Sequence, residues 1–125
     1  MTNAAWILCG YGTIMRNILP EINKIHPCSL ITNYGLDSGQ KIEDLWKGIT
    51  FYGKGHGGFD ESLIPNHVKD FGGDILITVY DTWALQKLHI ELAQNRIPWI
   101  PYVFIDSEDL NPVYKATLGY AFKLI

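Results

Sequence analysis

The fold is decided by two apolar runs, DILITVYD at residues 74–81 and WIPYVFID at residues 99–106. Each run ends in an aspartate, and the segment from Trp83 to Arg96 between them carries apolar side chains at helical spacing. A helical connection of this length makes the two strands parallel. Asp81 and Asp106 are therefore expected at the same carboxyl edge of one sheet, which is where open α/β sheets bind ligands.

The start of the chain also indicates a strand, a turn and a helix. Residues 5–9 form a short apolar run that Gly10-Tyr11-Gly12 closes, and isoleucines then recur at helical spacing. Pro20 lies inside this helical pattern and removes a main-chain donor, so we expect a kink or a break there. A tight glycine turn thus joins the first strand to the first helix.

The middle of the chain has a weaker pattern. A second strand is expected at residues 28–33, and a short third strand at residues 49–52 after one helical turn at residues 41–48. The next segment, YGKGHGGFD, places four glycines around His56 and is expected to be a flexible loop. A further helix then ends at Gly72-Gly73, immediately before the apolar run at residues 74–81.

This alternation of strands and helices predicts an α/β fold in a single domain of 125 residues. We expect a Rossmann-like, doubly wound parallel sheet in a three-layer α/β/α arrangement. In the usual strand order, 3-2-1-4-5, the first and fourth strands are neighbours and a crevice opens between them. Gly10-Tyr11-Gly12 and Asp81 should then lie on the two sides of that crevice.

The composition limits the classes of partner. Only 18% of the residues are charged, which leaves apolar surface for a partner domain or for a homodimer through the edge strand and a terminal helix. The net charge is -3 and the basic residues are scattered, which argues against nucleic acid. The N-terminus lacks the features of a signal peptide, and no run reaches the roughly 18 apolar residues of a transmembrane segment. We expect a cytoplasmic protein with two reduced cysteines, Cys9 and Cys28.

The glycine turn has two possible roles. It could let the main chain approach a phosphate at the start of a helix, or it could serve only the sharp strand-to-helix connection. The dinucleotide-binding fingerprint fails because its third glycine is Met15 here, and the second strand ends in Asn33 instead of an acid. No nicotinamide or other cofactor is therefore expected.

Several polar residues are candidates for a site. Asp81 could cap the following helix or contact a ligand. Asp106 and Glu108 belong to an acidic turn that is either solvated or supplies an acid for proton transfer. His56, in its glycine-rich loop, could act as a base or contact substrate. The remaining histidines show no metal-ligand spacing, so no metal site is expected.

Three segments resemble a known family. In chain order they are GYGTIMRNILPEI, GDILITVYDTWAL and IPWIPYVFIDSEDL, and together they cover about half of the chain. They resemble the N-terminal domain of group 1 glycosyltransferases of the GT-B fold, especially an archaeal-like subset, in which a GYG-x-x-x-RN turn precedes a D-x-W strand end and a W-x-P-Y-apolar-D strand.

The resemblance implies transfer of a sugar from a nucleotide-sugar donor to a sugar or lipid acceptor, in a cleft between two Rossmann-like domains and without an obligatory metal. This chain corresponds to the acceptor-side domain. By position, Asp81 and Asp106 are the candidate catalytic residues on the acceptor side, although many relatives carry a histidine where Asp106 stands. The substrate-binding candidates are Gly10 and Gly12 beside the donor phosphates, and Tyr11, Thr13, His56, Trp83 and Glu108.

The donor-binding C-terminal domain of that family has no counterpart in residues 1–125. We therefore expect the chain to be inactive alone and to need a second Rossmann-like domain or a partner chain. The alternative is a stand-alone Rossmann-like module that binds a ligand or a protein without catalysis.

Overall fold

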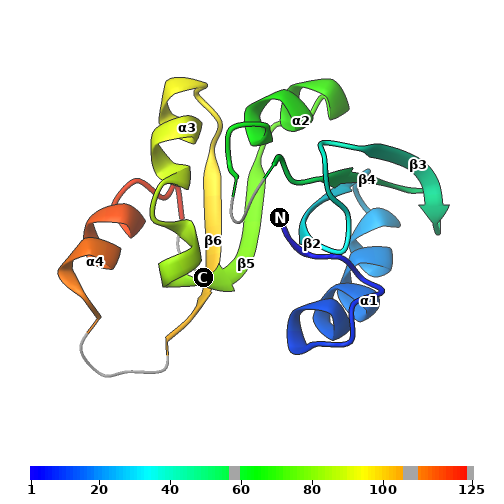
Figure 1. Ribbon diagram of the computed structural model, residues 1–125, viewed down its shortest axis with the longest axis horizontal. Helices are drawn as coiled ribbons and strands as arrows, with labels where there is room; N and C mark the ends of the chain where they lie inside the picture. Colours follow the sequence, from blue (N-terminus) through cyan, green and yellow to red (C-terminus); the bar gives the residue numbers. More distant parts are fainter. Residues whose placement is uncertain (57–59, 106–109, 124–125) are drawn as a thin grey trace.

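The two apolar runs form a pair of parallel strands, β5 (Leu76–Asp81) and β6 (Trp99–Phe104). The pairing extends from Leu76 opposite Trp99 to Asp81 opposite Phe104, which confirms the parallel pair predicted from the sequence. Figure 1 shows this pair in a computed structural model that describes residues 1–56, 60–105 and 110–123. The chain is a mixed α/β domain with mostly parallel strands.

A second sheet has the strand order β1-β2-β4-β3. The strands β1 (Thr2–Asn3), β2 (Ser29–Tyr34) and β4 (Ile49–Gly53) are parallel to one another, and β3 (Lys41–Trp46) runs antiparallel to β4. The carboxyl ends of the parallel strands in both sheets form the carboxyl edge, where the candidate site residues lie.

Met1 connects the two sheets. Its carbonyl oxygen accepts a hydrogen bond from the Val79 amide at 3.0 Å, and its amino group donates to the Ile77 carbonyl at 2.5 Å. The N-terminus accordingly lies between β2 and β5 in Figure 1. These hydrogen bonds place the start of the chain next to β5, between the sheet β1-β2-β4-β3 and the pair β5-β6.

The prediction of a first strand at residues 5–9 is wrong. Those residues form a turn, and the strand is the two-residue β1 before them. The turn is closed by hydrogen bonds from the Ile7 amide to the Ala4 carbonyl and from the Cys9 amide to the Ile7 carbonyl, and the Cys9 thiol then caps the next helix by accepting from the Gly12 amide. Leu8 is 91% exposed and Trp6 is 39% exposed, so of this run only Ala5 is a buried member of the core. A strand of two residues has no side-chain alternation for a pattern search to detect.

The prediction of a helical turn at residues 41–48 is also wrong, because β3 and β4 form a hairpin. Trp46 pairs with Ile49, which leaves Lys47 and Gly48 as a two-residue loop. Both loop residues have positive φ angles, 53° and 73°, as the tight turns of such hairpins require. Glycine adopts this backbone readily, whereas a lysine at positive φ gives no such sequence signal.

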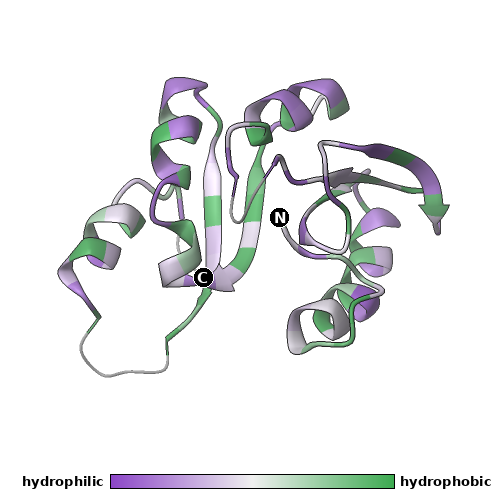
Figure 2. Cartoon of the chain, in the orientation of Figure 1, coloured by the Kyte–Doolittle hydropathy of each residue, from purple (hydrophilic) through white to green (hydrophobic). Residues whose placement is uncertain are grey.

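Four helices and one short 3-10 helix complete the described chain. The first, α1 (Gly10–Asn23), continues through Pro20 without the expected break. The predicted helix at Trp83 to Arg96 is divided into a 3-10 helix, η1 (Thr82–Leu85), and α3 (Leu88–Gln94). The others are α2 (Ile64–Phe71) and α4 (Pro112–Leu118). Apolar and polar residues alternate along α1 and α3 in Figure 2, as expected for helices with one buried face.

The core consists of two clusters. Consecutive residues of β2, β4 and β5 belong alternately to one cluster and to the other. One cluster packs α1 against the sheet and includes Met15, Leu19, Leu30, Ile49, Phe51 and Val79. The other packs α2, η1 and α3 and includes Ile31, Tyr52, Val68, Tyr80, Leu85, Leu88 and Trp99. Successive side chains of a strand point to opposite faces, so the two clusters lie on the two faces of the strands.

We expect Leu88→Ala to lower the free energy of unfolding by about 3 kcal/mol, because Leu88 is fully buried in the second cluster. Ile90→Ala is the matched control on the same helix, where the side chain is 48% exposed, and should cost less than about 1 kcal/mol. Urea unfolding followed by circular dichroism measures both. Equal losses would show that α3 does not pack as described.

Candidate functional site

Three parallel strands bring polar side chains together at their carboxyl ends. Asn3 ends β1, Asn33 lies next to the end of β2, and Tyr80 lies next to the end of β5. The Tyr80 hydroxyl donates a hydrogen bond to the Asn3 side-chain oxygen. Burial raises the pKa of Tyr80 to about 12, although the hydrogen bond with the Asn33 side chain opposes this shift. The hydroxyl therefore stays protonated at neutral pH and keeps its hydrogen bond to Asn3.

Cys9 extends this polar network to the start of α1. The Asn3 amide nitrogen lies 3.3 Å from the Cys9 sulfur, and the Gly12 amide nitrogen lies 3.4 Å from it. Burial raises the pKa of the thiol, but hydrogen bonds from Asn3 and from the Gly12 and Tyr11 amides outweigh it and hold the pKa below its ordinary value. Both cysteines are partly exposed, so we expect the lower pKa of Cys9 to make its thiol the more reactive of the two.

Asp81, at the end of β5, lies next to Tyr11 of the glycine turn at this edge. The sequence predicted that Asp81 and the glycine turn would lie at the same edge. Asp81 precedes η1 but its side chain makes no capping hydrogen bond. Burial raises the pKa of Tyr11 well above its usual range, and a hydrogen bond with the Asp81 carboxylate adds to the shift. The Tyr11 ring also lies 5.0 Å from that of Tyr80 and 5.5 Å from that of Phe104. The crevice predicted between the turn and Asp81 is therefore bridged by the Tyr11 side chain.

The glycine turn has a structural explanation at one of its two glycines. A β-carbon on Gly12 would lie 2.1 Å from the Ile7 carbonyl oxygen, so this close approach requires glycine. Gly10 has open space where a β-carbon would be. Thr13 is exposed in the first turn of α1, and Trp83 is 51% exposed on η1.

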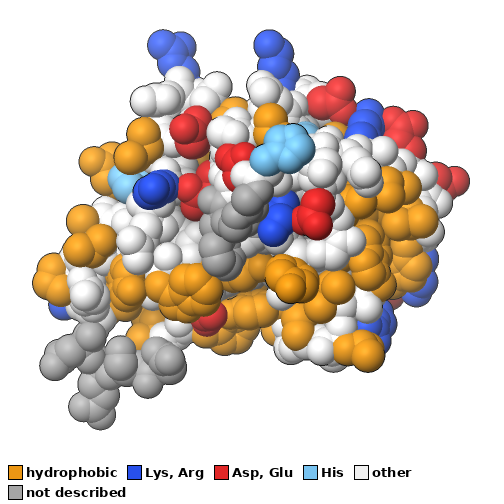
Figure 3. Space-filling model, viewed as in Figure 1, with side chains coloured by type: hydrophobic (Ala, Val, Ile, Leu, Met, Phe, Trp, Pro, Cys, Tyr) orange, Lys and Arg blue, Asp and Glu red, His pale blue; other side chains and the backbone are white. Residues whose placement is uncertain are grey.

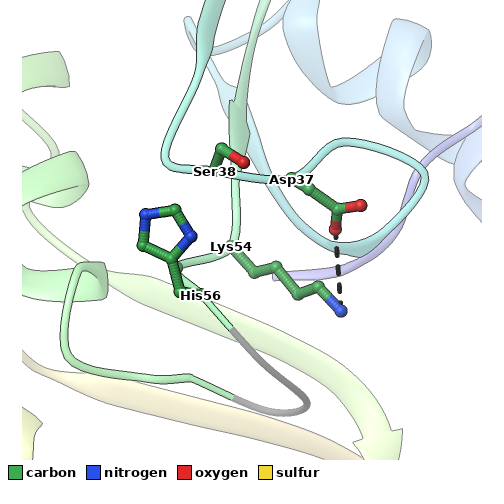
Figure 4. A pocket seen from close by; sticks show the side chains of 5 residues that line it. Asp37, Ser38, Lys54 and His56 are labelled. Atoms are coloured by element: carbon green, nitrogen blue, oxygen red, sulfur yellow. Dashed lines mark ion pairs between the residues drawn. The ribbon is translucent and has the colours of Figure 1, made fainter.

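His56 lies in a second polar group on the same edge, at the ends of β2 and β4. A cavity of about 220 Å³ is lined by Asp37, Ser38, Lys54, Gly55 and His56. Figure 4 shows the Lys54 ammonium extended toward Asp37, which it pairs with at 3.6 Å. Ser38 has a φ of 60°, a backbone conformation that is unfavourable for serine and typical of functional sites. The structure therefore does not place His56 opposite Asp81.

Buried polar contacts hold the end of β4 beside this cavity. The His67 ring nitrogen Nε2 lies 3.0 Å from the Gly53 carbonyl oxygen, and burial lowers the pKa of His67. The neighbouring Tyr52 hydroxyl donates to Asp70 at 2.7 Å. Both contacts join β4 to α2. They therefore fix the main chain at Gly53, immediately before Lys54.

A larger cavity, of about 330 Å³, is apolar. Its lining residues are Ala5, Trp6, Leu45 and Trp46, none of which is ionisable. The Trp6 indole donates to the Gly35 carbonyl at 3.2 Å, and its ring lies 5.0 Å from that of Phe51. Hydrophobic side chains also gather along the lower side of Figure 3, where β5 and β6 end in Figure 1. The carboxyl edge thus combines buried polar groups with apolar surroundings.

Glu61 is a buried carboxyl group that the sequence pattern did not indicate. Only 8% of the residue is exposed. Burial raises its pKa to about 7; Lys87 opposes the shift, while Glu91 and Asp60 add to it. The residue follows the segment that carries His56, but lies against α3.

Two of the predicted site residues, Asp106 and Glu108, lie outside the described residues. Across residues 1–56, 60–105 and 110–123, no three histidine, cysteine, aspartate or glutamate side chains are grouped closely enough to hold a metal ion. The same part of the chain contains no helix with the length and apolar character needed to cross a bilayer.

Sequence reasoning missed the amide and hydroxyl groups of the site. No sequence motif marks Asn3, Asn33 or Tyr80. The only feature that they share is a position at the end of a short strand or next to it. Lys54 was missed because the glycines around His56 suggested flexibility. Comparisons with protein-family models, with curated proteins and with solved structures found no match for this chain.

We expect Cys9 to be alkylated by iodoacetamide at pH 7.5 on the order of tenfold faster than Cys28, because burial raises the pKa of Cys28. Peptide mass spectrometry over time measures both rates in one sample. Asn3→Leu removes a donor to the Cys9 sulfur and should slow Cys9 alone. Equal rates in the wild-type chain would contradict the assignment.

We expect Glu61→Gln to stabilise the protein at pH 8 by about 2 kcal/mol and to have little effect at pH 4. The carboxyl group has a pKa of about 7 in the folded state, above its ordinary value of 4.5, so the folded chain retains a proton that the unfolded chain has lost. Wild-type stability from this group therefore falls as the pH rises from 4.5 to 7.

Urea unfolding at both pH values measures the difference, with Glu21→Gln on the exposed side of α1 as the control. If Glu61→Gln has the same effect at pH 4 and at pH 8, ionisation of Glu61 is not its cause.

Proposed function

We propose that this chain is the acceptor-side domain of a two-domain glycosyltransferase and that it binds the acceptor at the carboxyl edge of its parallel strands. The observation that carries the proposal is the convergence of Asn3, Tyr80 and Asp81 where β1 and β5 meet. Ligands of open α/β sheets bind at such a switch point, where the order of the strands reverses direction. Both cysteines are free, which fits a cytoplasmic location.

A Rossmann-like, doubly wound, three-layer arrangement is the architecture that we infer for the domain. The strand order β4-β2-β1-β5-β6 supports it, as do the two core clusters, which pack α1 on one face and α2 with α3 on the other. The connection from β2 to β4 departs from the usual pattern, because it contains the β3 strand instead of a helix. The departure lies at the side of the sheet away from Asp81.

The chemistry of the edge suits a sugar or another polyhydroxyl acceptor. Asn3 and Asp81 are partly exposed, so an amide group and a carboxylate can reach sugar hydroxyls, while the buried Asn33 and Tyr80 hold Asn3 in place. The rings of Tyr11 and Trp83 supply apolar surface for the carbon face of a sugar. A few placed polar groups among apolar ones are typical of small-molecule sites.

Asp81 is the proposed general base. In the reaction it accepts the proton of an acceptor hydroxyl while that oxygen bonds to the anomeric carbon of the donor and the bond from this carbon to the diphosphate breaks. The hydrogen bond with Tyr11 orients the carboxylate. Stabilising the departing diphosphate needs positive charge or amide donors, which we assign to a second Rossmann-like domain or partner chain.

A stand-alone binding module is the second candidate. It is favoured by the polar cavity around Lys54, Ser38 and His56, which is formed entirely within this chain. In this case a small polar ligand binds beside Lys54 and no bond is made or broken.

We expect glucose, mannose or N-acetylglucosamine to shift the amide resonances of Asn3, Asn33 and Asp81 in NMR titrations of the isotope-labelled chain. Asp81→Ala should weaken this binding by about tenfold or more, because a charged hydrogen-bond partner is lost. Asp74→Ala is the matched control, since Asp74 lies before β5 at the opposite edge and should leave the dissociation constant within about twofold.

Equal effects of the two variants would contradict acceptor binding at Asp81. Shifts confined to Lys54 and its neighbours would favour the binding module instead. The chain alone should release no UDP from UDP-glucose, and turnover without a second polypeptide would show that the proposed second domain is unnecessary.

A further inference from the structure

One face of the β5 and β6 pair is left uncovered in the described structure. On that face Ile77 is 43% exposed and Tyr102 is 41% exposed. On the opposite face Leu76 is 5% exposed and Trp99 is 2% exposed, beneath α3 and the second core cluster. Parallel strands occur almost only in sheets that are covered on both faces. The exposed face therefore lacks a layer.

The α1 helix lies on the same side of the sheet but covers other strands. It packs on β2 and β4, and in Figure 1 it lies on their side of the N-terminus, away from β6. Val79 belongs to the α1 cluster, and Ile77 shares its face of β5 because side chains alternate along a strand. Tyr102 pairs with Val79 and also lies on this face.

A row of α1 side chains borders the uncovered strands. The Tyr11 ring contacts Phe104 of β6 at 5.5 Å, which fixes the side of α1 that faces them. Ile18 and Ile22 lie seven and eleven positions after Tyr11, almost directly in line with it along the helix. They are 46% and 39% exposed. The contact of Tyr11 with Phe104 joins this row to the strands at one end, and we group the exposed apolar residues of both as the open face: Ile18, Ile22, Ile75, Ile77, Tyr102 and Phe104.

The size and chemistry of the open face favour a copy of itself. The exposed parts of its six residues sum to roughly 500 Å², which is large for an apolar patch on a monomer. Two such faces bury on the order of 1,000 Å² before any surrounding residues are added, which reaches the range of specific interfaces. None of the six side chains is charged, so two identical faces meet without like-charge repulsion.

We propose that two copies of this chain associate through their open faces, related by a two-fold axis. Each copy then supplies the layer that the other lacks over β5 and β6. Such an interface is isologous, with the same residues on both sides. Phe104 pairs with Asp81 across the two strands, so the interface borders the carboxyl edge. The proposal does not depend on the proposed glycosyltransferase role.

Sedimentation equilibrium between about 1 and 300 µM tests the proposal. The chain has a mass of 14.2 kDa, and we expect the average mass to rise toward twice that value with concentration. Ile77→Glu and Ile18→Glu should each weaken association by at least about a hundredfold, because they place like charges in the apolar interface. Leu45→Glu is the control: this residue is 50% exposed on β3, outside the open face, and the variant should dimerise as the wild type does.

Hydroxyl-radical footprinting of the wild-type chain gives a second readout that does not depend on the folding of a variant. Tyr102 should be labelled at 1 µM and protected at 300 µM, while Tyr120 and Phe122, which are 63% and 74% exposed elsewhere, stay labelled at both concentrations. A monomer throughout this range would overturn the proposal and leave the face to a helix from another chain or domain. Dimers that resist both open-face variants, or that Leu45→Glu disrupts, would also overturn it.

Discussion

The architecture depends on the insertion of the first residues of the chain between two strands that are distant in sequence. The Val79 amide of β5 donates to the Met1 carbonyl, and the Ala4 amide donates to the Tyr34 carbonyl at the end of β2. Thr2 between them is fully buried. These main-chain hydrogen bonds satisfy groups that would be costly to bury unpaired. They connect the two sheets and set the positions of the ends of β1, β2 and β5 relative to one another.

The candidate site follows from this insertion. Asn3 ends β1 between Asn33 of β2 and Tyr80 of β5, so three polar side chains meet that are far apart in the sequence. The hydrogen bond from Tyr80 to Asn3 and the contact of Asn3 with Cys9 then connect the core to the start of α1. Because these groups are largely buried, each must have a partner, and the network specifies the geometry of the edge.

The same framework separates two kinds of surface. The carboxyl edge gathers polar groups because parallel strands end there together, whereas the open face is exposed because the helices in the described part of the chain cover only the other side of β5 and β6. The proposed ligand site and the open face therefore meet where Asp81 pairs with Phe104.

The amino-acid sequence by itself determined the parallel pair β5 and β6 and the helix α1, because long apolar runs and helical spacing are properties of local segments. It also determined that Tyr11 and Asp81 would lie near each other. Only the tertiary structure decided the position of β1, whose two residues carry no periodic signal, and the hairpin of β3, whose residues are mostly exposed.

Tertiary structure also decided which polar residues form the site. Asn3, Asn33 and Tyr80 become neighbours through pairing between strands, and Lys54 reaches Asp37 through the alignment of the ends of β2 and β4. The sequence contains each of these residues, but it does not show which of them lie next to one another in the folded chain. The physical reason is that side-chain periodicity reports which face of an element is buried, while the choice of neighbouring strand depends on hydrogen bonds between segments distant in the chain.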